Sequence, residues 1–351
     1  MTTNKKSIRF FDNGTYVTFY SDNKDEIEVI RNCFCYFWSE VDSEKAVDNW
    51  SVISQKVPQL NHIFDIEKIS DETSLFNYSQ VKKRVIGNIH YYIHDLDKVD
   101  CLTCFDVANK KVYYYHEQNI EEYHLLRNLI REPIIAKYID LGYKGIHASS
   151  CTINEKGVVI PGIKGAGKTS LLTHLLENGA RYIGNDFVLY KKDNESVNLK
   201  AIPQAVRYTE ETINANEVLS NYYKKFGFGK LIDGKVEFQP SLFDRIYLNH
   251  CLSSTSKLEL VVLPSFDLAR FDYSIQIIDY DRTLLNLSML YILEHDFTWS
   301  PFFCNYNSFP DVSEAEEVIQ FSPRICRLNF GILSYEKQKE LFDDISNVLN
   351  I

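Results

Sequence analysis

Residues 157–172 read Gly157-Val158-Val159-Ile160-Pro161-Gly162-Ile163-Lys164-Gly165-Ala166-Gly167-Lys168-Thr169-Ser170-Leu171-Leu172. The stretch begins as an apolar strand, passes through a glycine-rich turn and enters a segment in which leucines recur at helical spacing. Within it, Gly162, Gly167, Lys168 and Thr169 fit the pattern G-x-x-x-x-G-K-[ST]. The sequence therefore predicts a strand, a phosphate-binding loop (Walker A) and a helix in direct succession.

The residue types in this loop suit the binding of a triphosphate. Glycines accept left-handed backbone angles, so successive amides can turn toward phosphate oxygens, and the following helix adds unpaired amides at its positive end. Lys168 is expected to reach the β- and γ-phosphates, and the Thr169 hydroxyl to bind Mg²⁺. The residues expected to bind ATP or another NTP are Gly162, Ile163, Lys164, Gly165, Ala166, Gly167, Lys168, Thr169 and Ser170. A structural glycine turn is the alternative, and the strand before the loop and the helix after it disfavour it.

Length and composition indicate a globular protein of about two domains. The chain has 351 residues, of which 45% are hydrophobic and 25% charged. Its formal net charge of −10 argues against general binding to nucleic acid or to acidic membranes. The chain has no apolar run of membrane-spanning length, and its start does not resemble a signal peptide, so we expect a cytoplasmic protein.

The 8 cysteines are then expected to be reduced thiols. Cys33 and Cys35, together with Cys101 and Cys104, form two close pairs that could supply four thiolates to zinc. The alternative is that they are small buried hydrophobic residues, which the aromatic sequence around Cys33 favours.

The first part of the chain, residues 1–135, predicts a mixed, antiparallel α+β domain. A hairpin is expected over residues 7–20 and a helix after Ser21-Asp22. Strands are expected over residues 85–93, 101–107 and 111–115, with a turn at Asn109-Lys110 between the last two. Ser70-Asp71-Glu72 is a possible helix start, and residues 120–140 read as helix interrupted at Pro133.

Residues 136–351 predict an α/β domain that contains the phosphate loop. A strand over residues 145–153 and a turn at residues 154–157 make a hairpin with the phosphate-loop strand. If this turn centres near Glu155, His147 falls opposite Ile163 and Lys164. His147 then either lies beside the triphosphate or is a structural histidine whose hydrogen bonds are satisfied at the edge of the sheet.

The helix is expected to end at Asn178-Gly179, and a further strand, Arg181-Tyr182-Ile183-Gly184-Asn185-Asp186, follows it. A strand–helix–strand crossover makes the two strands parallel, so Asn185 and Asp186 are expected at the same edge as the phosphate loop. An acid there can hold Mg²⁺ or take a proton from an attacking hydroxyl. A simple turn acid is the alternative for Asp186.

The rest of the chain predicts strands near residues 187–191, 197–201, 258–263 and 273–278. Helical periodicity recurs in residues 281–294 and 335–350. Residues 224–230 are basic and glycine-rich, which fits either a lid over a substrate or a solvated loop.

These features together resemble the catalytic domain of the HPr kinase/phosphorylase family. The resemblance rests on His147-Ala148-Ser149, the apolar strand, the phosphate loop with its helix, and Asn185-Asp186-Phe187-Val188. It implies a P-loop kinase domain that transfers the γ-phosphoryl group of ATP, with Mg²⁺, to a hydroxyl of a peptide or protein, usually serine. It also implies catalytic roles for Lys168, Asp186 and His147, metal binding by Thr169 and Asp186, and a homo-oligomer.

The sequence departs from the family pattern in two places. Asn185 stands where the family has the first acid of a pair, the one associated with general-base work. A glycine-rich signature segment found downstream in the bifunctional enzymes has no clear counterpart. A nucleotide-binding recognition module and a simple NTPase therefore remain alternatives to a kinase.

Overall fold

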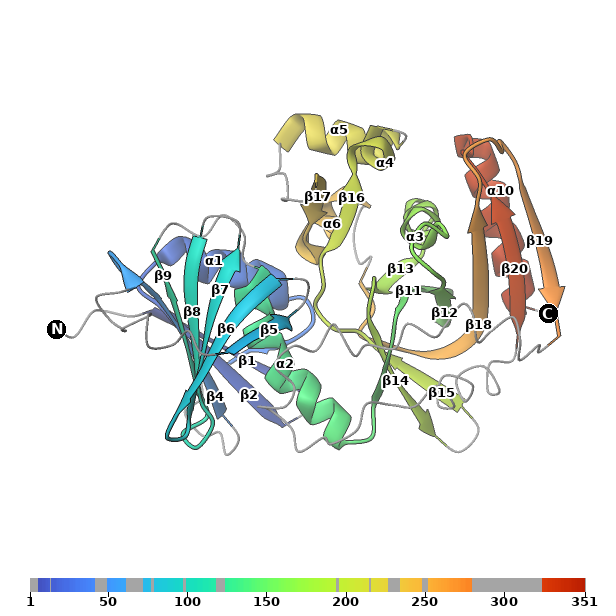
Figure 1. Cartoon of the computed structure of the whole chain (residues 1–351). Helices are drawn as coiled ribbons and strands as arrows, with labels where there is room; N and C mark the ends of the chain where they lie inside the picture. Colours follow the sequence, from blue (N-terminus) through green and yellow to red (C-terminus); the bar gives the residue numbers. More distant parts are fainter. Residues whose placement is uncertain are drawn as a thin grey trace. The chain divides into compact units, whose positions relative to one another are not determined.

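The computed structural model describes residues 6–12, 14–41, 49–60, 72–76, 79–96, 99–117, 124–193, 196–214, 216–226, 234–247, 252–279 and 324–350. These residues form two compact units, one ending at Leu141 and the other beginning at Gly142 (Figure 1). The chain is a mixed α/β protein, and each unit has its own sheet and core. None of the described helices combines the length and the apolar character needed to cross a membrane.

The first unit contains two helices and a sheet within its described residues. The elements are β1 (Lys6–Asp12), β2 (Thr15–Ser21), α1 (Lys24–Phe34), β3 (Ser39–Glu40), β4 (Asn49–Lys56), β5 (Glu72–Phe76), β6 (Ser79–Ile86), β7 (Ile89–Leu96), β8 (Val99–Asp106), β9 (Lys111–His116) and α2 (His124–Asp140). The described strands run in the order β3-β1-β2-β4-β9-β8-β7-β6-β5. Strands β5 to β9 form an antiparallel meander, whereas β2, β4 and β9 are parallel. The expected antiparallel sheet is therefore correct for the meander and wrong for the middle of the sheet.

Three local expectations in this unit are wrong. The run 85–93 is not one strand, because β6 ends at Ile86 and β7 begins at Ile89 after a turn in which Gly87 has φ 60°. Glu72 starts a strand rather than a helix. Helix α2 continues through Pro133, because Ile130 and Ile134 are both fully buried and hold the helix in place despite the missing amide hydrogen. The hairpins β1–β2 and β8–β9 are confirmed.

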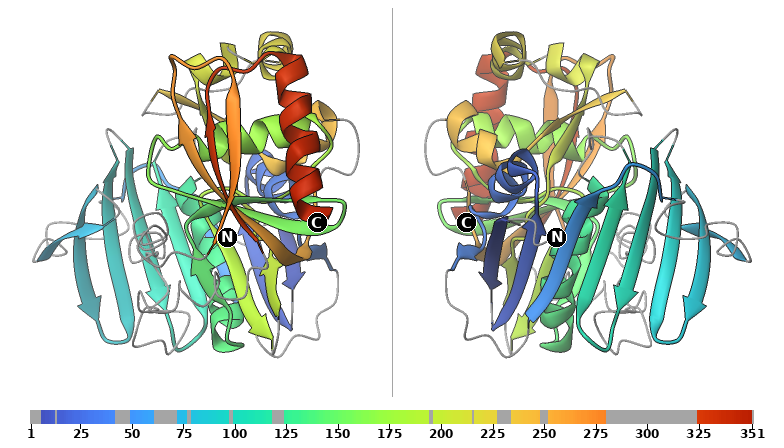
Figure 2. Two further views of the ribbon diagram at one scale, coloured as in Figure 1. Left: turned by 90° about the vertical axis from the view of Figure 1, so that its right-hand side faces the viewer. Right: turned by 90° about the vertical axis from the view of Figure 1, so that its left-hand side faces the viewer.

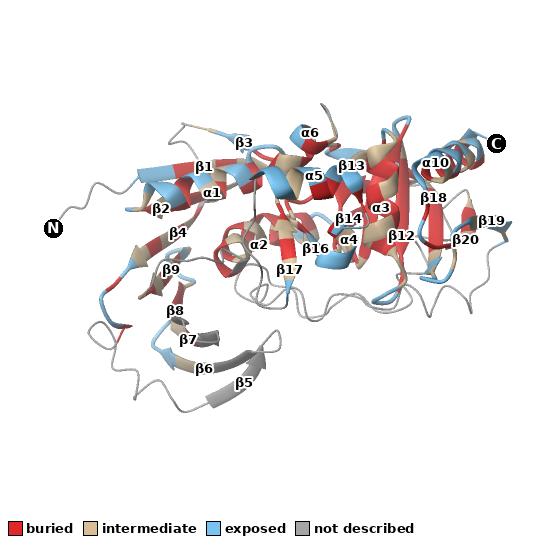
Figure 3. Ribbon diagram, turned by 90° about the horizontal axis from the view of Figure 1, so that it is seen from above, coloured by how far each residue is buried: buried red, intermediate tan, exposed pale blue. Residues whose placement is uncertain are grey.

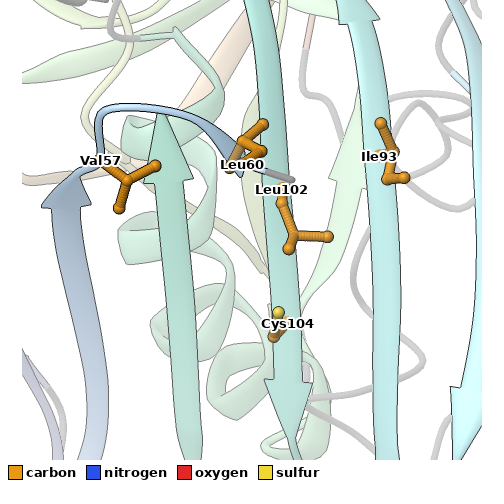
Figure 4. Packing of buried hydrophobic residues seen from close by; sticks show 5 residues of the cluster. All are labelled: Val57, Leu60, Ile93, Leu102 and Cys104. Atoms are coloured by element: carbon orange, nitrogen blue, oxygen red, sulfur yellow. The ribbon is translucent and has the colours of Figure 1, made fainter. Parts of the chain in front are cut away.

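A small cluster of buried hydrophobic residues packs on part of the first sheet. Val57 and Leu60 follow β4 and pack with Ile93 of β7 and with Leu102 and Cys104 of β8 (Figure 4). Burial raises the pKa of Cys104 to about 12, so the thiol stays protonated. No described residues form a group of three or more histidine, cysteine or acidic side chains placed to hold a metal ion, and the zinc alternative gains no support.

The second unit is built around one long strand, β18. Its elements are β10 (Lys144–Ile146), β11 (Ala148–Ile153), β12 (Lys156–Pro161), α3 (Lys168–Glu177), β13 (Arg181–Gly184), β14 (Val188–Asp193), β15 (Ser196–Lys200), β16 (Val206–Thr209), α4 (Glu210–Asn214), α5 (Glu217–Phe226), β17 (Lys235–Phe238), α6 (Pro240–Ile246), β18 (Thr255–Phe266), β19 (Tyr273–Ile278), β20 (Ile325–Phe330) and α10 (Tyr335–Asn350). The main path of the sheet is β10-β14-β15-β18-β12-β11-β13, and β20 and β19 extend it from the second half of β18. Strand β18 pairs in parallel with both β12 and β20, which brings the ends of these three strands together.

Two helices pack beside this sheet. Helix α3 contacts β11 and β12, and α10 contacts α3 and β19 (Figure 2). The leucines that predicted α3 are buried, whereas several residues of the edge strand β19 are exposed (Figure 3). The expected strand 273–278 and helix 335–350 are confirmed with their predicted ends, and the expected strands near residues 197–201 and 258–263 are confirmed with shifted ends. The helix expected over residues 281–294 and most of the expected lid, residues 227–230, lie outside the described residues.

Candidate functional site

The phosphate-loop motif lies at the ends of three strands. Strands β11 and β12 form the predicted antiparallel hairpin, in which Ala148 pairs with Pro161. Strand β13 pairs with the other side of β11, also antiparallel. Strands β12 and β13 therefore point the same way, as the crossover predicts, but β11 lies between them. Their C-terminal ends share one edge of the sheet, and residues 162–170 and 185–186 both begin there.

The backbone of the loop has the conformation that its glycines make possible. Gly162, Gly165 and Gly167 have φ of 154°, 87° and 91°. The amide of Ala166 donates to the Ile163 carbonyl over 3.2 Å, which closes the loop into a tight turn. Gly167 is the N-cap of α3, and the amide of Leu171 donates to its carbonyl over 2.8 Å. Among the described residues, no acceptor binds the amides of Gly165, Lys168 or Thr169, which leaves them available to an anion.

Lys168 folds back over the loop. Its Nζ donates to the Gly162 carbonyl over 2.7 Å and to the Ile163 carbonyl over 3.2 Å. The side chain is buried, and burial lowers its pKa, while the nearby Asp186 carboxylate acts in the opposite direction. A desolvated ammonium held by neutral carbonyls gains more from a phosphate oxygen than a solvated one does. The ammonium of Lys168 therefore lies against the loop, bound to two of its carbonyls.

Asn185 and Asp186 differ sharply in their surroundings. Asn185 is 1% exposed, and its Oδ1 accepts hydrogen bonds from Ser149 over 2.7 Å and from Thr169 over 3.3 Å. Asp186 is half-buried and has φ of 64°, a left-handed conformation that is rare for a residue other than glycine. Backbone strain of this kind is often found at functional sites.

His147 lies between β10 and β11, at the point where the chain leaves β14 and begins to pair with β12. The residue after it pairs with Pro161, so the backbone register places His147 level with Gly162. The sequence-based register, opposite Ile163 and Lys164, is off by one or two residues. His147 therefore lies at the same edge as the loop.

The remaining residues of the predicted loop lie between the end of β12 and the first turn of α3. Ile163, Lys164 and Gly165 are exposed, and Ser170 is in the first turn of α3. Hydrogen bonds join Lys168 to the loop and Thr169 to Asn185, and the charges of Lys168 and Asp186 interact. The backbone register of β11 and β12 places His147 at the same edge of the sheet.

Three residues of the site escaped sequence reasoning. Ser149, fully buried on β11, anchors Asn185. Phe266 and Phe330, at the ends of β18 and β20, approach Gly167 so closely that an added Cβ would lie 2.7 Å from Phe266 Cβ and 2.8 Å from Phe330 Cζ. The local sequence does not indicate these roles, because each of the three side chains contacts a residue that is distant in sequence.

The oxygen atoms at this edge suit Mg²⁺ in kind. A magnesium ion at a nucleotide site takes one or two protein oxygens and completes its shell with phosphates and water. The Thr169 hydroxyl and the Asp186 carboxylate are hard oxygen ligands of this type, and Asp186 is partly accessible. The residues present therefore fit Mg²⁺ bound together with a triphosphate.

Comparison with known proteins gives structural likenesses only. No protein-family model matches the chain, and a comparison with curated proteins gives no match. Among solved structures, the HPr(Ser) kinase/phosphatase from Coxiella burnetii is similar over 58% of this chain and 95% of that chain, with 11% sequence identity and a TM-score of 0.27. At this TM-score the likeness carries no weight of its own, so the interpretation of the site rests on the residues of this chain.

Proposed function

We propose that the protein is an ATP-dependent kinase of the HPr kinase type, which transfers the γ-phosphoryl group to a hydroxyl of a peptide or protein, serine in particular. The observation that carries the proposal is the placing of Lys168, in its phosphate loop, and the Asp186 carboxylate at one edge of the sheet. Phosphoryl transfer depends mainly on positioning and on stabilising charge, so a compact set of groups is sufficient in kind.

Each group has a defined part in this proposal. The free amides of the loop and Lys168 hold the phosphates and stabilise the charge of the transferring group. Thr169 and Asp186 hold Mg²⁺, which neutralises part of the triphosphate charge when it is bound. Asp186 orients the acceptor hydroxyl and takes up its proton, since Asn185 has no basic group. His147 lies beside the transferring group and contributes a further hydrogen bond.

The test is transfer of label from γ-labelled ATP to serine-containing peptides and to free serine, in the presence of Mg²⁺. Lys168→Ala is expected to weaken ATP binding and to lower turnover together. Asp186→Asn should lower kcat by about 10²- to 10⁴-fold, with a smaller loss of affinity for ATP in the presence of Mg²⁺, because a charged metal ligand is replaced by a neutral one. Asp193→Asn, at the exposed end of β14, is the matched control and should behave as wild type. An unchanged kcat in Asp186→Asn would show that Asp186 is not the general base.

A nucleotide-binding recognition module or a simple NTPase is the second candidate, and the neutral, buried Asn185 favours it. A recognition module predicts ATP binding without transferred label. An NTPase predicts steady release of phosphate that does not depend on any acceptor. The same labelled-ATP experiment separates the three functions.

A further inference from the structure

Asn185 occupies a junction of three elements. It follows β13, its Oδ1 accepts from Ser149 of β11 over 2.7 Å, and it also accepts from Thr169 of α3 over 3.3 Å. Asn185 is 1% exposed and Ser149 is fully buried. A buried amide oxygen with two hydroxyl donors is a well-satisfied group, so the position of Asn185 is firmly fixed.

The direction of these hydrogen bonds decides what Thr169 can do. A threonine hydroxyl has one proton and two lone pairs, and a carbonyl oxygen can only accept. When the hydroxyl gives its proton to Asn185, both of its lone pairs stay free and are turned away from the amide. A hydroxyl oxygen in this state is prepared to bind a hard cation.

The same contacts rule out two other roles for Asn185. An amide oxygen is not a base at neutral pH, and both of its hydrogen-bonding directions here are occupied by hydroxyls from the protein. With 1% exposure, the side chain does not reach an acceptor substrate. The partly exposed Asp186, next in the chain, is the group that can do so.

We propose that Asn185 is a positioning residue, which binds the proton of the Thr169 hydroxyl and so presents the hydroxyl oxygen to the Mg²⁺ that accompanies the nucleotide, with Ser149 holding Asn185 in place. The inference rests on the proposed nucleotide binding and deepens it. The asparagine then marks a division of labour between two neighbours, in which Asn185 orients the metal ligand and Asp186 faces the substrate.

The test uses equilibrium binding rather than turnover. Calorimetry gives the affinity for ATP with and without Mg²⁺, and the ratio of the two is the Mg²⁺ enhancement. Asn185→Ala and Thr169→Val are each expected to lower the enhancement by about five- to tenfold, while the affinity for metal-free ATP changes little. The double variant should resemble Thr169→Val alone, because Asn185 acts through that hydroxyl.

Other variants separate positioning from a general structural effect. Asn185→Asp keeps an acceptor oxygen and should retain the enhancement. Ser149→Ala should lower it by about two- to threefold, since it removes the anchor and leaves the Thr169 contact. Ser150→Ala is the matched control: Ser150 is equally buried on β11, its hydroxyl has no hydrogen-bond partner among the described residues, and no change is expected. If Asn185→Ala fails to fold, the cycle of Ser149→Ala with Thr169→Val takes its place.

Several results would overturn the inference. These are equal losses of affinity with and without Mg²⁺, additive effects in the double variant, or a wild-type protein whose ATP affinity does not respond to Mg²⁺. The proposed kinase function fails separately. If the variants give the expected changes in Mg²⁺ enhancement but the wild-type protein transfers no label, Asn185 is a positioning residue in a nucleotide-binding module that is not a kinase.

Discussion

Gly167 is the residue at which the phosphate loop meets the core of its unit. It has φ of 91°, and an added Cβ would lie 2.7 Å from Phe266 Cβ and 2.8 Å from Phe330 Cζ. Gly165, two residues earlier, has a similar φ of 87°, with nothing within 4 Å of an added Cβ. The two glycines thus share a backbone requirement, and only Gly167 also has a packing requirement.

Alanine substitutions separate these two requirements. Gly165→Ala should lower the free energy of unfolding by about 1 kcal/mol, the cost of a left-handed backbone for an alanine. Gly167→Ala should lower it by at least about 1 kcal/mol more, because Phe266 and Phe330 must move. Denaturant unfolding of both variants measures the difference. Equal losses would mean that the two rings yield freely and that the loop is not held by them.

The sequence predicted the residues of the loop, because each acts within a few positions of its neighbours. Lys168 binds carbonyls five and six residues away, and Gly167 caps the helix that it begins. Ser149 could not be predicted in its role, since its bond to Asn185 spans 36 positions. That bond depends on β13 pairing with β11, which local pattern does not reveal.

Among the elements, β11 shows why the relative direction of two strands is easier to predict than their order in the sheet. A crossover fixes the relative direction of β12 and β13, and this prediction is confirmed. The crossover does not determine whether the two strands are neighbours in the sheet, and here β11 lies between β12 and β13. Pro133 shows a similar limit, since the burial that keeps α2 continuous comes from distant side chains.

Helix α10 has cations at its C-terminal end. Lys156 Nζ donates to the Leu349 carbonyl over 2.7 Å and to Asn350 Oδ1 over 3.1 Å, and Arg324 donates to the Val348 carbonyl. Positive charge at this end satisfies carbonyls that lack partners within the helix and complements the helix dipole. These contacts tie the last helix to β12, the strand that leads into the phosphate loop.

Lys156→Ala should therefore lower the free energy of unfolding by about 1 kcal/mol. Lys257, which pairs with Lys156 across β12 and β18, is the matched control. Its amine is 3.2 Å from Glu259 at the surface, and Lys257→Ala should change the free energy of unfolding by less than about 0.5 kcal/mol. Thermal or denaturant unfolding of the pair is the measurement. A loss as large in Lys257→Ala would show that Lys156 acts through the strand rather than through the helix end.

In the first unit, buried polar groups tie helix α1 to the sheet. Glu26 of α1 accepts from Ser21 over 2.8 Å and lies 3.3 Å from His116 Nε2 of β9, and Ser54 of β4 is 3.3 Å from the same nitrogen. Burial alone would raise the pKa of Glu26, but the hydrogen bonds from His116, Ser21 and Ser54 together with the charge of His116 outweigh it and lower the pKa.

The lowered pKa sets the direction of an acid effect. Glu26 binds protons less readily in the folded chain than in the unfolded one, so its stabilising effect is complete above its ordinary pKa of 4.5 and is lost as pH falls through the lowered value. The free energy of unfolding, followed from pH 7 into this range, should fall less steeply in Glu26→Gln than in wild type. Parallel curves would mean that other carboxylates cause the acid effect.

At the scale of the whole molecule, the residues of the candidate site all lie in one of two units, each with its own sheet and core. The phosphate loop, Asn185 and Asp186 all belong to the unit that begins at Gly142, and the Glu26–His116 pair and the cluster around Leu102 belong to the unit that ends at Leu141. A ligand stabilises the state to which it binds by about 2.7 kcal/mol at a concentration 100 times its Kd. Where the cores are separate, that stabilisation appears as slower amide exchange in the unit that binds.

Hydrogen exchange with saturating Mg²⁺ and ATP tests this division. Protection should appear in residues 162–170, where free amides bind phosphate, and in the segment after β13, while strand β8 (residues 99–106) exchanges at its ligand-free rate. In Lys168→Ala, which lacks the ammonium that holds the phosphates, the same nucleotide concentration should leave both regions unprotected. Protection of β8 in wild type would contradict separate units, because slower exchange there requires that nucleotide binding also stabilise the first core.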